Sequence, residues 1–284
     1  MEQDTGKFRK NTKDQYYTKA SVAKHCVETI LRYVHDASSY EWIEPSAGTG
    51  VFLDCLPSHL DRIGLDIDPK RSDIQKCNFL DWEPTAETKR IFFGNPPFGR
   101  QSCLAKAFLK HAAQYATILA FILPRSFVKP SMSRAIPQRF HCIHSEELQT
   151  NSFEVNGKEY EVPCVFQIWE KRDTDRPKVE AVQEKGFQYV KHGESFHIAF
   201  KRVGGLAGTC SPWNTGTTFN AQFHYFLKLE DIYVPHLPEI IARVNAHVFP
   251  SNTVGPRSLS KSEANEVLNE VLENAIQSIA NRGQ

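Results

Sequence analysis

The chain has 284 residues, 40% of them hydrophobic and 24% charged, and its formal net charge is +1. This length and composition are typical of an ordinary globular protein, with room for one large domain or for a catalytic domain with a modest appendage. The near-neutral charge excludes a global attraction to nucleic acid or membranes, so a polyanionic partner would have to meet a local basic patch.

The seven cysteines are scattered along the chain without a C-x-x-C pair. An odd number without such pairs argues against a disulfide framework and a zinc ribbon, and it favours a reducing compartment. His141-Cys142-Ile143-His144 lacks a second pair of ligands, so we expect no metal site. The polar, basic start and the absence of an 18-residue apolar run predict neither export nor membrane insertion. We therefore expect an intracellular protein, cytoplasmic or nucleoid-associated.

Residues 1–14 are polar and predict a flexible arm. A helix is expected next, because apolar residues recur every four positions from Val22 to Val34, with Ser21 able to cap its start. Strands and helices then alternate: the expected strands are 41–44, 62–69, one ending in 78–82, 91–93 and 116–123, and the expected helices are 51–56, 104–115 and 131–140. This alternation predicts an α/β fold with a doubly wound, mostly parallel, seven-stranded Rossmann-like sheet.

The pattern changes after Cys142. Two strand-like runs, 145–155 and 162–169, flank Asn156-Gly157, which predicts a hairpin that closes the sheet as an antiparallel edge. A more polar stretch at 171–178 predicts a linker, so we divide the chain into 15–172 and 173–284. The second part is expected to be a small α+β region, with a strand over 196–200 and a final helix that begins with a capping box of Ser260 and Glu263.

A glycine-rich turn, Pro45-Ser46-Ala47-Gly48-Thr49-Gly50, joins the strand that ends at Glu44 to the following helix. Its two glycines allow a tight turn and close approach of the backbone to a ligand. A phosphate-binding loop would carry lysine or more glycine, so the acid favours a ligand with amino and sulfonium charge. Asp66 ends the next strand, where a carboxylate can accept the hydroxyls of a ribose, and Asn78 could hydrogen-bond the edge of an adenine.

Asn95-Pro96-Pro97-Phe98 follows the apolar run Ile91-Phe92-Phe93. The two prolines fix the direction of the carbonyl groups, and an aromatic ring stands beside them. An asparagine oxygen and a backbone carbonyl can accept both hydrogens of the exocyclic amine of a base, on which Phe98 could stack. The alternative is that the Pro-Pro pair only ends a strand.

Together, and in this order, these segments resemble the motifs of the gamma-class N6-adenine DNA methyltransferases. The resemblance covers about residues 15–170 and implies S-adenosylmethionine as methyl donor. The residues that it places around the cofactor are Tyr17, Thr18, Glu44, Pro45, Ala47, Gly48, Gly50, Asp66 and Asn78, the last standing where the family usually has aspartate. It also implies a flipped adenine, with Asn95 and the Pro96 carbonyl on its N6 amine, Pro97 completing the turn, and Phe98 and Phe153 on its two faces.

The resemblance implies a site-specific adenine methyltransferase of the restriction-modification kind, with DNA preferred over RNA. Basic residues of the second part that lie beside glycine, aromatic residues or the start of the last helix are expected to contact phosphates: Lys201, Arg202, Arg257 and Lys261. The region after Lys171 is short for a recognition domain, so a partner subunit could complete it. The alternatives are a methyltransferase acting on RNA adenine or on protein glutamine, and a catalytically silent subunit that binds nucleic acid.

Overall fold

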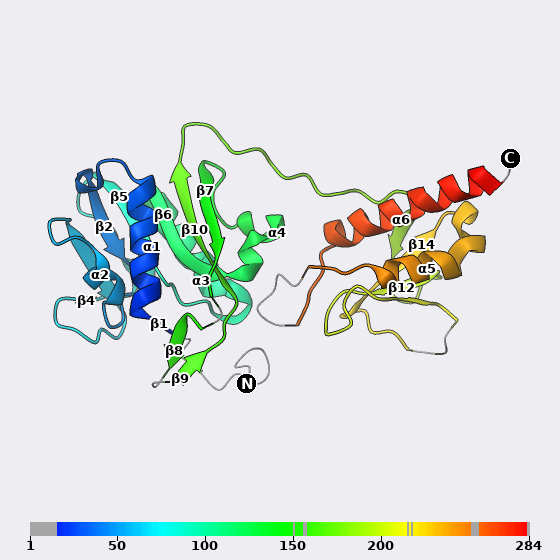
Figure 1. Cartoon of the computed structure of the whole chain (residues 1–284), viewed down its shortest axis with the longest axis horizontal. Coiled ribbons are helices and arrows are strands. Elements are labelled where there is room, and N and C mark those ends of the chain that lie inside the picture. Colours follow the sequence, from blue (N-terminus) through cyan, green and yellow to red (C-terminus); the bar gives the residue numbers. More distant parts are fainter. Residues whose placement is uncertain are drawn as a thin grey trace. The chain divides into compact units, whose positions relative to one another are not determined.

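The computed structural model describes residues 16–149, 151–155, 158–214, 216, 218–250 and 256–282. The chain forms two compact units, Met1–Lys178 and Val179–Gln284 (Figure 1). The division lies at the end of the predicted linker, 171–178. The predicted arm, 1–14, and the predicted Asn156-Gly157 turn lie outside the described residues.

Most of the predicted linker is attached to the first unit by Arg176. Its guanidinium donates hydrogen bonds of 2.7–2.8 Å to the backbone carbonyls of Ser133, Ile136, Pro137 and Phe140. It also lies 5.2 Å from the centre of the Trp169 ring, within reach of a cation–π contact. The segment up to Arg176 is therefore part of the first unit.

The first unit is built on a seven-stranded sheet in the order β4-β3-β2-β5-β6-β10-β7. Its strands are β2 (Tyr40–Glu44), β3 (Arg62–Asp66), β4 (Gln75–Lys76), β5 (Lys89–Gly94), β6 (Ile118–Pro124), β7 (Phe140–Glu147) and β10 (Cys164–Lys171). The five strands from β4 to β6 are parallel, and β10 runs antiparallel to both β6 and β7. The predicted mostly parallel sheet with an antiparallel edge hairpin is confirmed.

Helices cover the sheet because its central strands are mostly buried. All seven residues of β6 are buried. The helices are α1 (Ala20–Tyr33), α2 (Val51–Cys55), α3 (Cys103–Tyr115) and the short α4 (Pro130–Ser133). In Figure 1, α1 crosses in front of the strands. Helix α3 buries Phe108 and Leu109 in a core cluster that also contains Phe92 and Leu119 of the sheet.

Three predicted boundaries are wrong. Ser21 lies inside α1, whose N-cap is Lys19 and carries no side-chain cap. The predicted strand through 78–82 is replaced by β4 and by a 3₁₀ turn, because the Asn78 side chain accepts a hydrogen bond from the Leu80 N–H and so favours a turn. The predicted helix over 131–140 ends at Ser133, since a proline at 137 cannot continue it and Phe140 already begins β7.

The hairpin prediction is correct for the edge of the sheet, but the strands that pair there are not adjacent in sequence. The long strands β7 and β10 pair with each other, and a separate short hairpin of β8 (Phe153–Val155) and β9 (Lys158–Tyr160) lies between them in sequence. β8 also pairs with β1 (Tyr17–Thr18), so these three strands form a second, small sheet. The strands β8 and β9 therefore belong to this small sheet and not to the central one.

The second unit is an antiparallel sheet that packs against helices. The strand order is β11-β14-β12-β13, with β11 (Phe187–Val190), β12 (Ile198–Lys201), β13 (Cys210–Pro212) and β14 (His224–Leu229). Residues of α5 (Leu237–Ala246) and α6 (Lys261–Arg282) share a core cluster with these strands. The predicted capping box is confirmed, since Ser260 donates its backbone N–H to Glu263 at 2.9 Å and its Oγ accepts from the Glu263 N–H at 3.3 Å. None of the described helices is long and apolar enough to cross a membrane.

Candidate active site

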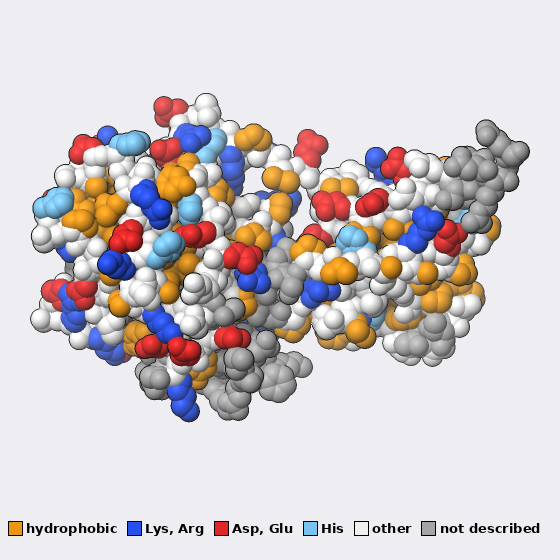
Figure 2. Space-filling view, viewed as in Figure 1, with side chains coloured by type: hydrophobic (Ala, Val, Ile, Leu, Met, Phe, Trp, Pro, Cys, Tyr) orange, Lys and Arg blue, Asp and Glu red, His pale blue; other side chains and the backbone are white. Residues whose placement is uncertain are grey.

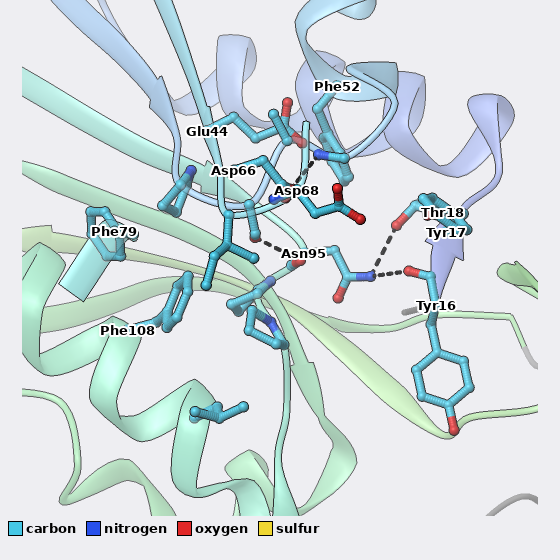
Figure 3. Close-up of a pocket in the computed structure, with 18 of the residues that line it drawn as sticks. Tyr16, Tyr17, Thr18, Glu44, Phe52, Asp66, Asp68, Phe79, Asn95 and Phe108 are labelled. Atoms are coloured by element: carbon cyan, nitrogen blue, oxygen red, sulfur yellow. Dashed lines mark hydrogen bonds between the residues drawn. The ribbon is translucent and has the colours of Figure 1, made fainter. Parts of the chain in front are cut away.

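A cavity of about 310 Å³ opens in the first unit at the carboxyl ends of β2 and β5 (Figure 3). β2 lies between β3 and β5, so the order of the parallel strands reverses between β2 and β5. This is the position where open α/β sheets bind ligands. The predicted site residues that line the cavity are Tyr17, Thr18, Glu44, Pro45, Ala47, Gly48, Asp66, Asn78, Asn95, Pro96, Pro97 and Phe98.

The glycine-rich turn after β2 depends on backbone angles that favour glycine. Gly48 and Gly50 have φ angles of +52° and +80°. A Cβ at Gly48 would stand 3.4 Å from the Tyr17 ring, and one at Gly50 would collide with the guanidinium of Arg71. Among the described residues, Gly48 lines the cavity, whereas Gly50, although predicted as a cofactor residue, does not and contributes the second positive φ angle of the turn.

Asp66 ties this turn to the end of β3. One carboxylate oxygen accepts the Gly48 N–H at 2.7 Å, and the other accepts the Asp68 N–H at 2.8 Å. Each oxygen of an ionised carboxylate has a second lone pair, so both can still accept a hydroxyl hydrogen from a ligand. Asp66 is therefore a structural acceptor in the turn and a candidate ribose ligand at the same time.

Glu44 is the buried acid of the site, with 2% of its surface exposed. Burial, the largest cause, raises the pKa of Glu44 well above its ordinary value, against a hydrogen bond from the Leu53 backbone that lowers it, while the charge of Asp66 raises it further. Gly94 leaves room for this side chain, because a Cβ there would stand 3.0 Å from the Glu44 Cγ. The Oε2 atom has no hydrogen-bond partner among the described residues. A buried carboxyl with a free oxygen is suited to a cationic ligand.

Asn95 presents the second free acceptor. Its Nδ2 donates to the Tyr16 carbonyl at 3.1 Å and to Thr18 Oγ1 at 3.2 Å, as the dashed lines in Figure 3 show. Its Oδ1 is buried and has no hydrogen-bond partner among the described residues. The backbone carbonyl of Asn95 accepts from Ser46 Oγ at 3.0 Å, which joins the turn after β5 to the turn after β2.

Aromatic side chains close the cavity at the start of α3. Phe98 is half-buried against the core, and its carbonyl accepts the N–H groups of Leu104 and Ala105 at 3.2 and 3.3 Å. The rings of Phe79 and Phe108 lie 5.0 Å apart, and both line the cavity. This end of the site is aromatic and apolar, which suits a planar ring.

Two sequence-predicted residues lie in unexpected surroundings. The Asn78 amide donates to Asp81 at 2.7 Å and accepts from the Leu80 N–H, so it is engaged within its own turn. Phe153 is fully buried in β8. The centre of its ring lies 6.4 Å from that of Tyr16, and the planes of the two rings are inclined at 67°. Among the described residues, Tyr16 lines the cavity and Phe153 does not. The contacts of Asn78 and Phe153 with adenine therefore stay predictions.

Several lining residues were not predicted from the sequence: Tyr16, Ser46, Phe52, Phe79 and Phe108. Tyr16 directly precedes Tyr17-Thr18, and Ser46 lies inside the glycine-rich turn, so adjacency to a motif is the signal that could have identified both. The three phenylalanines lie in apolar segments, and the hydrophobic pattern of such segments predicts only that they are buried in a core.

The predicted phosphate-contact residues are in the second unit. The Arg202 guanidinium lies 5.0 Å from the centre of the Tyr225 ring, and the Lys261 Nζ lies 3.9 Å from that of Tyr189. Arg202 and Arg257 each have a buried Nε without a hydrogen-bond partner among the described residues. The pairing of Val203 with Ser258 places the segments of Arg202 and Arg257 side by side. Lys201, partly exposed, ends β12 beside them.

Within the described ranges, no cluster of three or more His, Cys, Asp or Glu side chains is placed to hold a metal ion. Basic and acidic side chains are interspersed over the face of the first unit seen in Figure 2. This agrees with the near-neutral charge of the chain.

No family model and no curated protein matches the sequence. Similar solved structures include a "putative RNA methyltransferase" from Pyrococcus horikoshii, 17% identical over 57% of this chain and 90% of that one, with a TM-score of 0.45. A "putative class I S-adenosylmethionine-dependent methyltransferase" from Listeria monocytogenes is 14% identical over 60% of this chain and 65% of its own length, with a TM-score of 0.44. Magnesium protoporphyrin IX methyltransferase from Synechocystis, solved with bound S-adenosylmethionine, is 8% identical over 54% and 79%, with a TM-score of 0.39.

Proposed function

We propose that the first unit binds S-adenosylmethionine and methylates the N6 amine of an adenine flipped out of DNA. The observation that carries this proposal is the amide of Asn95, whose Oδ1 is buried beside the cavity and has no partner among the described residues, while its Nδ2 makes two hydrogen bonds. Buried acceptors are rarely left unpaired in folded proteins, because the lost hydrogen bonds to water cost about 1–3 kcal/mol. A ligand that donates an N–H group would satisfy this atom.

Residues on the β2–β3 side fit the methyl donor. Glu44 would pair with the amino group of its methionine part, and Asp66 would accept the hydroxyls of its ribose. The apolar walls of Phe79 and Phe108 would cover its adenine, with Tyr17 and Thr18 beside the methionine part. When bound, S-adenosylmethionine supplies a methyl group on a sulfonium, which is already a good leaving group.

Residues of the turn after β5 fit the methyl acceptor. Asn95 Oδ1 and the Pro96 carbonyl would accept the two N6 hydrogens, and Phe98 would stack on the base. Two hydrogen bonds and one stacked ring fix the amine in position and direct its lone pair at the methyl group. Orientation of this kind accounts for much of the acceleration in two-substrate reactions, and no covalent intermediate on the protein is needed.

Side chains of the second unit would bind the sugar-phosphate backbone of the nucleic acid. Arg202, Arg257 and Lys261 carry positive charge, and the tyrosine rings beside Arg202 and Lys261 could stack on unpaired bases. The choice of DNA over RNA rests on the resemblance of the motifs. A flipped adenine offers the same N6 edge in either nucleic acid.

The test is incubation with labelled S-adenosylmethionine and, separately, unmethylated duplex DNA, structured RNA and protein, followed by analysis of nucleosides and amino acids. We expect N6-methyladenine in DNA. N6-methyladenine in RNA alone would transfer the activity to the RNA alternative. Methylated glutamine would assign a protein substrate. Binding of nucleic acid without transfer to any acceptor would favour a silent subunit and contradict the proposal.

A further inference from the structure

The function of the Asn95 amide depends on its orientation, because its oxygen and its NH₂ group have nearly the same shape but opposite hydrogen-bonding roles. Oxygen and NH₂ could each face the cavity, and only their hydrogen-bond partners decide which one does. An NH₂ group in that position would oppose the N–H donors of an amine, whereas the oxygen accepts one of them. The residues that hold the other end of the amide therefore determine whether the acceptor half of the site can work.

Two acceptors hold that end, and both come from the segment ahead of α1. The Tyr16 carbonyl can only accept a hydrogen bond, so the group that faces it must be Nδ2. Thr18 Oγ1 takes the second Nδ2 hydrogen. With both hydrogens engaged, Oδ1 is the end left for the cavity, where it has no partner among the described residues.

The small sheet β1-β8-β9 keeps these two acceptors in place. Thr18 pairs with Phe153 in the strand register, and the next residue, Lys19, donates its N–H to the Ser152 carbonyl at 3.0 Å. The centre of the Tyr16 ring lies 6.4 Å from that of Phe153 and 6.1 Å from that of Tyr160, and both pairs of rings are edge-to-face. The buried ring of Phe153 thus supports the backbone that orients Asn95.

We propose that Thr18 is a positioning residue that fixes the Asn95 amide with its oxygen toward the acceptor. The nature of that acceptor rests on the proposed function, but the orientation itself does not. Thr18 is only 8% exposed, so water has little access to replace its hydroxyl group. Valine has the same shape and no acceptor, whereas serine keeps the acceptor, so this pair of substitutions separates the hydrogen bond from the packing.

The direct test observes the Asn95 side-chain amide by NMR, with the resonances assigned by their loss in Asn95→Asp. We expect Thr18→Val to move one of the two Nδ2 proton resonances and to speed its solvent exchange by about tenfold, as loss of one hydrogen bond predicts. Thr18→Ser should leave both resonances near their wild-type positions, as should Thr85→Val, a substitution in an exposed loop. Resonances unchanged in Thr18→Val would overturn the proposal.

The kinetic test separates positioning from cofactor binding. With saturating S-adenosylmethionine and DNA, Thr18→Val should lower kcat about tenfold while the KM for DNA changes little, and Thr18→Ser should restore kcat. A raised KM for S-adenosylmethionine with unchanged kcat would assign Thr18 to the cofactor alone and contradict the proposal. A wild-type protein that makes no N6-methyladenine but shows the amide response would instead refute the proposed function and leave the orientation of Asn95 in place.

Discussion

The two halves of the cavity are built in different ways. In the proposed donor half, the polar residues come from one continuous stretch, in which Glu44, the glycine-rich turn and Asp66 lie within 23 residues of one another and are joined by the Asp66–Gly48 hydrogen bond. The acceptor half depends on Asn95, whose amide is held by Tyr16 and Thr18, 79 and 77 positions away. These polar residues of the proposed donor half are a local feature of a βαβ unit, whereas the proposed acceptor half requires the folded unit.

Asn95→Ala should give the largest loss of kcat and should distinguish methyl transfer most clearly from cofactor binding. Loss of the amide removes an acceptor that orients the amine, and we expect kcat to fall by about 10²-fold or more, as for single groups that act in the transition state. The affinity for S-adenosylmethionine, measured by calorimetry, should change less than about threefold, since the donor half is built without this residue. A parallel loss of cofactor affinity would show that the halves are not separate.

Asp66→Ala tests the donor half in the converse way. The carboxylate accepts the N–H groups of Gly48 and Asp68, so its removal leaves both donors without an acceptor and the turn loses its tie to β3. We expect the Kd for S-adenosylmethionine to rise about 10–100-fold, as loss of two or more hydrogen bonds to a charged group predicts. Binding of the nucleic acid, followed by fluorescence anisotropy, should remain near wild type. Unchanged cofactor affinity would remove Asp66 from the donor half.

Titration of Glu44 should make both the stability of the fold and the binding of the cofactor depend on pH. Its raised pKa means that the folded protein without ligand binds a proton more tightly than the unfolded chain does, so this group stabilises the fold at low pH, and that contribution is lost as pH rises through the folded-state pKa. Glu44→Gln should therefore raise the Tm at pH 7 relative to wild type and weaken cofactor binding. Wild-type cofactor binding should also release a proton, which calorimetry in buffers of different ionisation enthalpy detects. A binding enthalpy independent of the buffer at every pH across the range in which Glu44 titrates would contradict the pairing of Glu44 with a cation.

The same contrast explains how much of the molecule the sequence could predict. The strand β6 is a continuous apolar run, β5 contains the apolar run Ile91-Phe92-Phe93, and the motif residues from Glu44 to Asp66 are close in sequence, so their positions followed from local patterns. β1 has only two residues and therefore no periodicity, and its partner β8 lies far along the chain. Tyr16 could not be identified as a partner of Asn95 for that reason. The strand predicted through Asn78 was wrong for a different reason. The Asn78 side chain accepts a hydrogen bond from the backbone two residues on, and this favours a turn over the strand that the residue pattern predicted.

The smallest expected effect concerns how the base reaches the acceptor half. Lys261 is exposed at the start of α6, with its Nζ over the Tyr189 ring. Lys261→Ala should weaken DNA binding a few-fold for every sequence and reduce the slope of log K against log salt by about 1, because one phosphate contact releases about one counterion. Lys228→Ala, an exposed lysine on β14, is the matched control and should leave the slope unchanged. Since Lys261 has no role in either half of the cavity, kcat at saturating DNA should match wild type. A lower kcat with an unaltered salt slope would mean that Lys261 acts on the chemistry rather than on the phosphates.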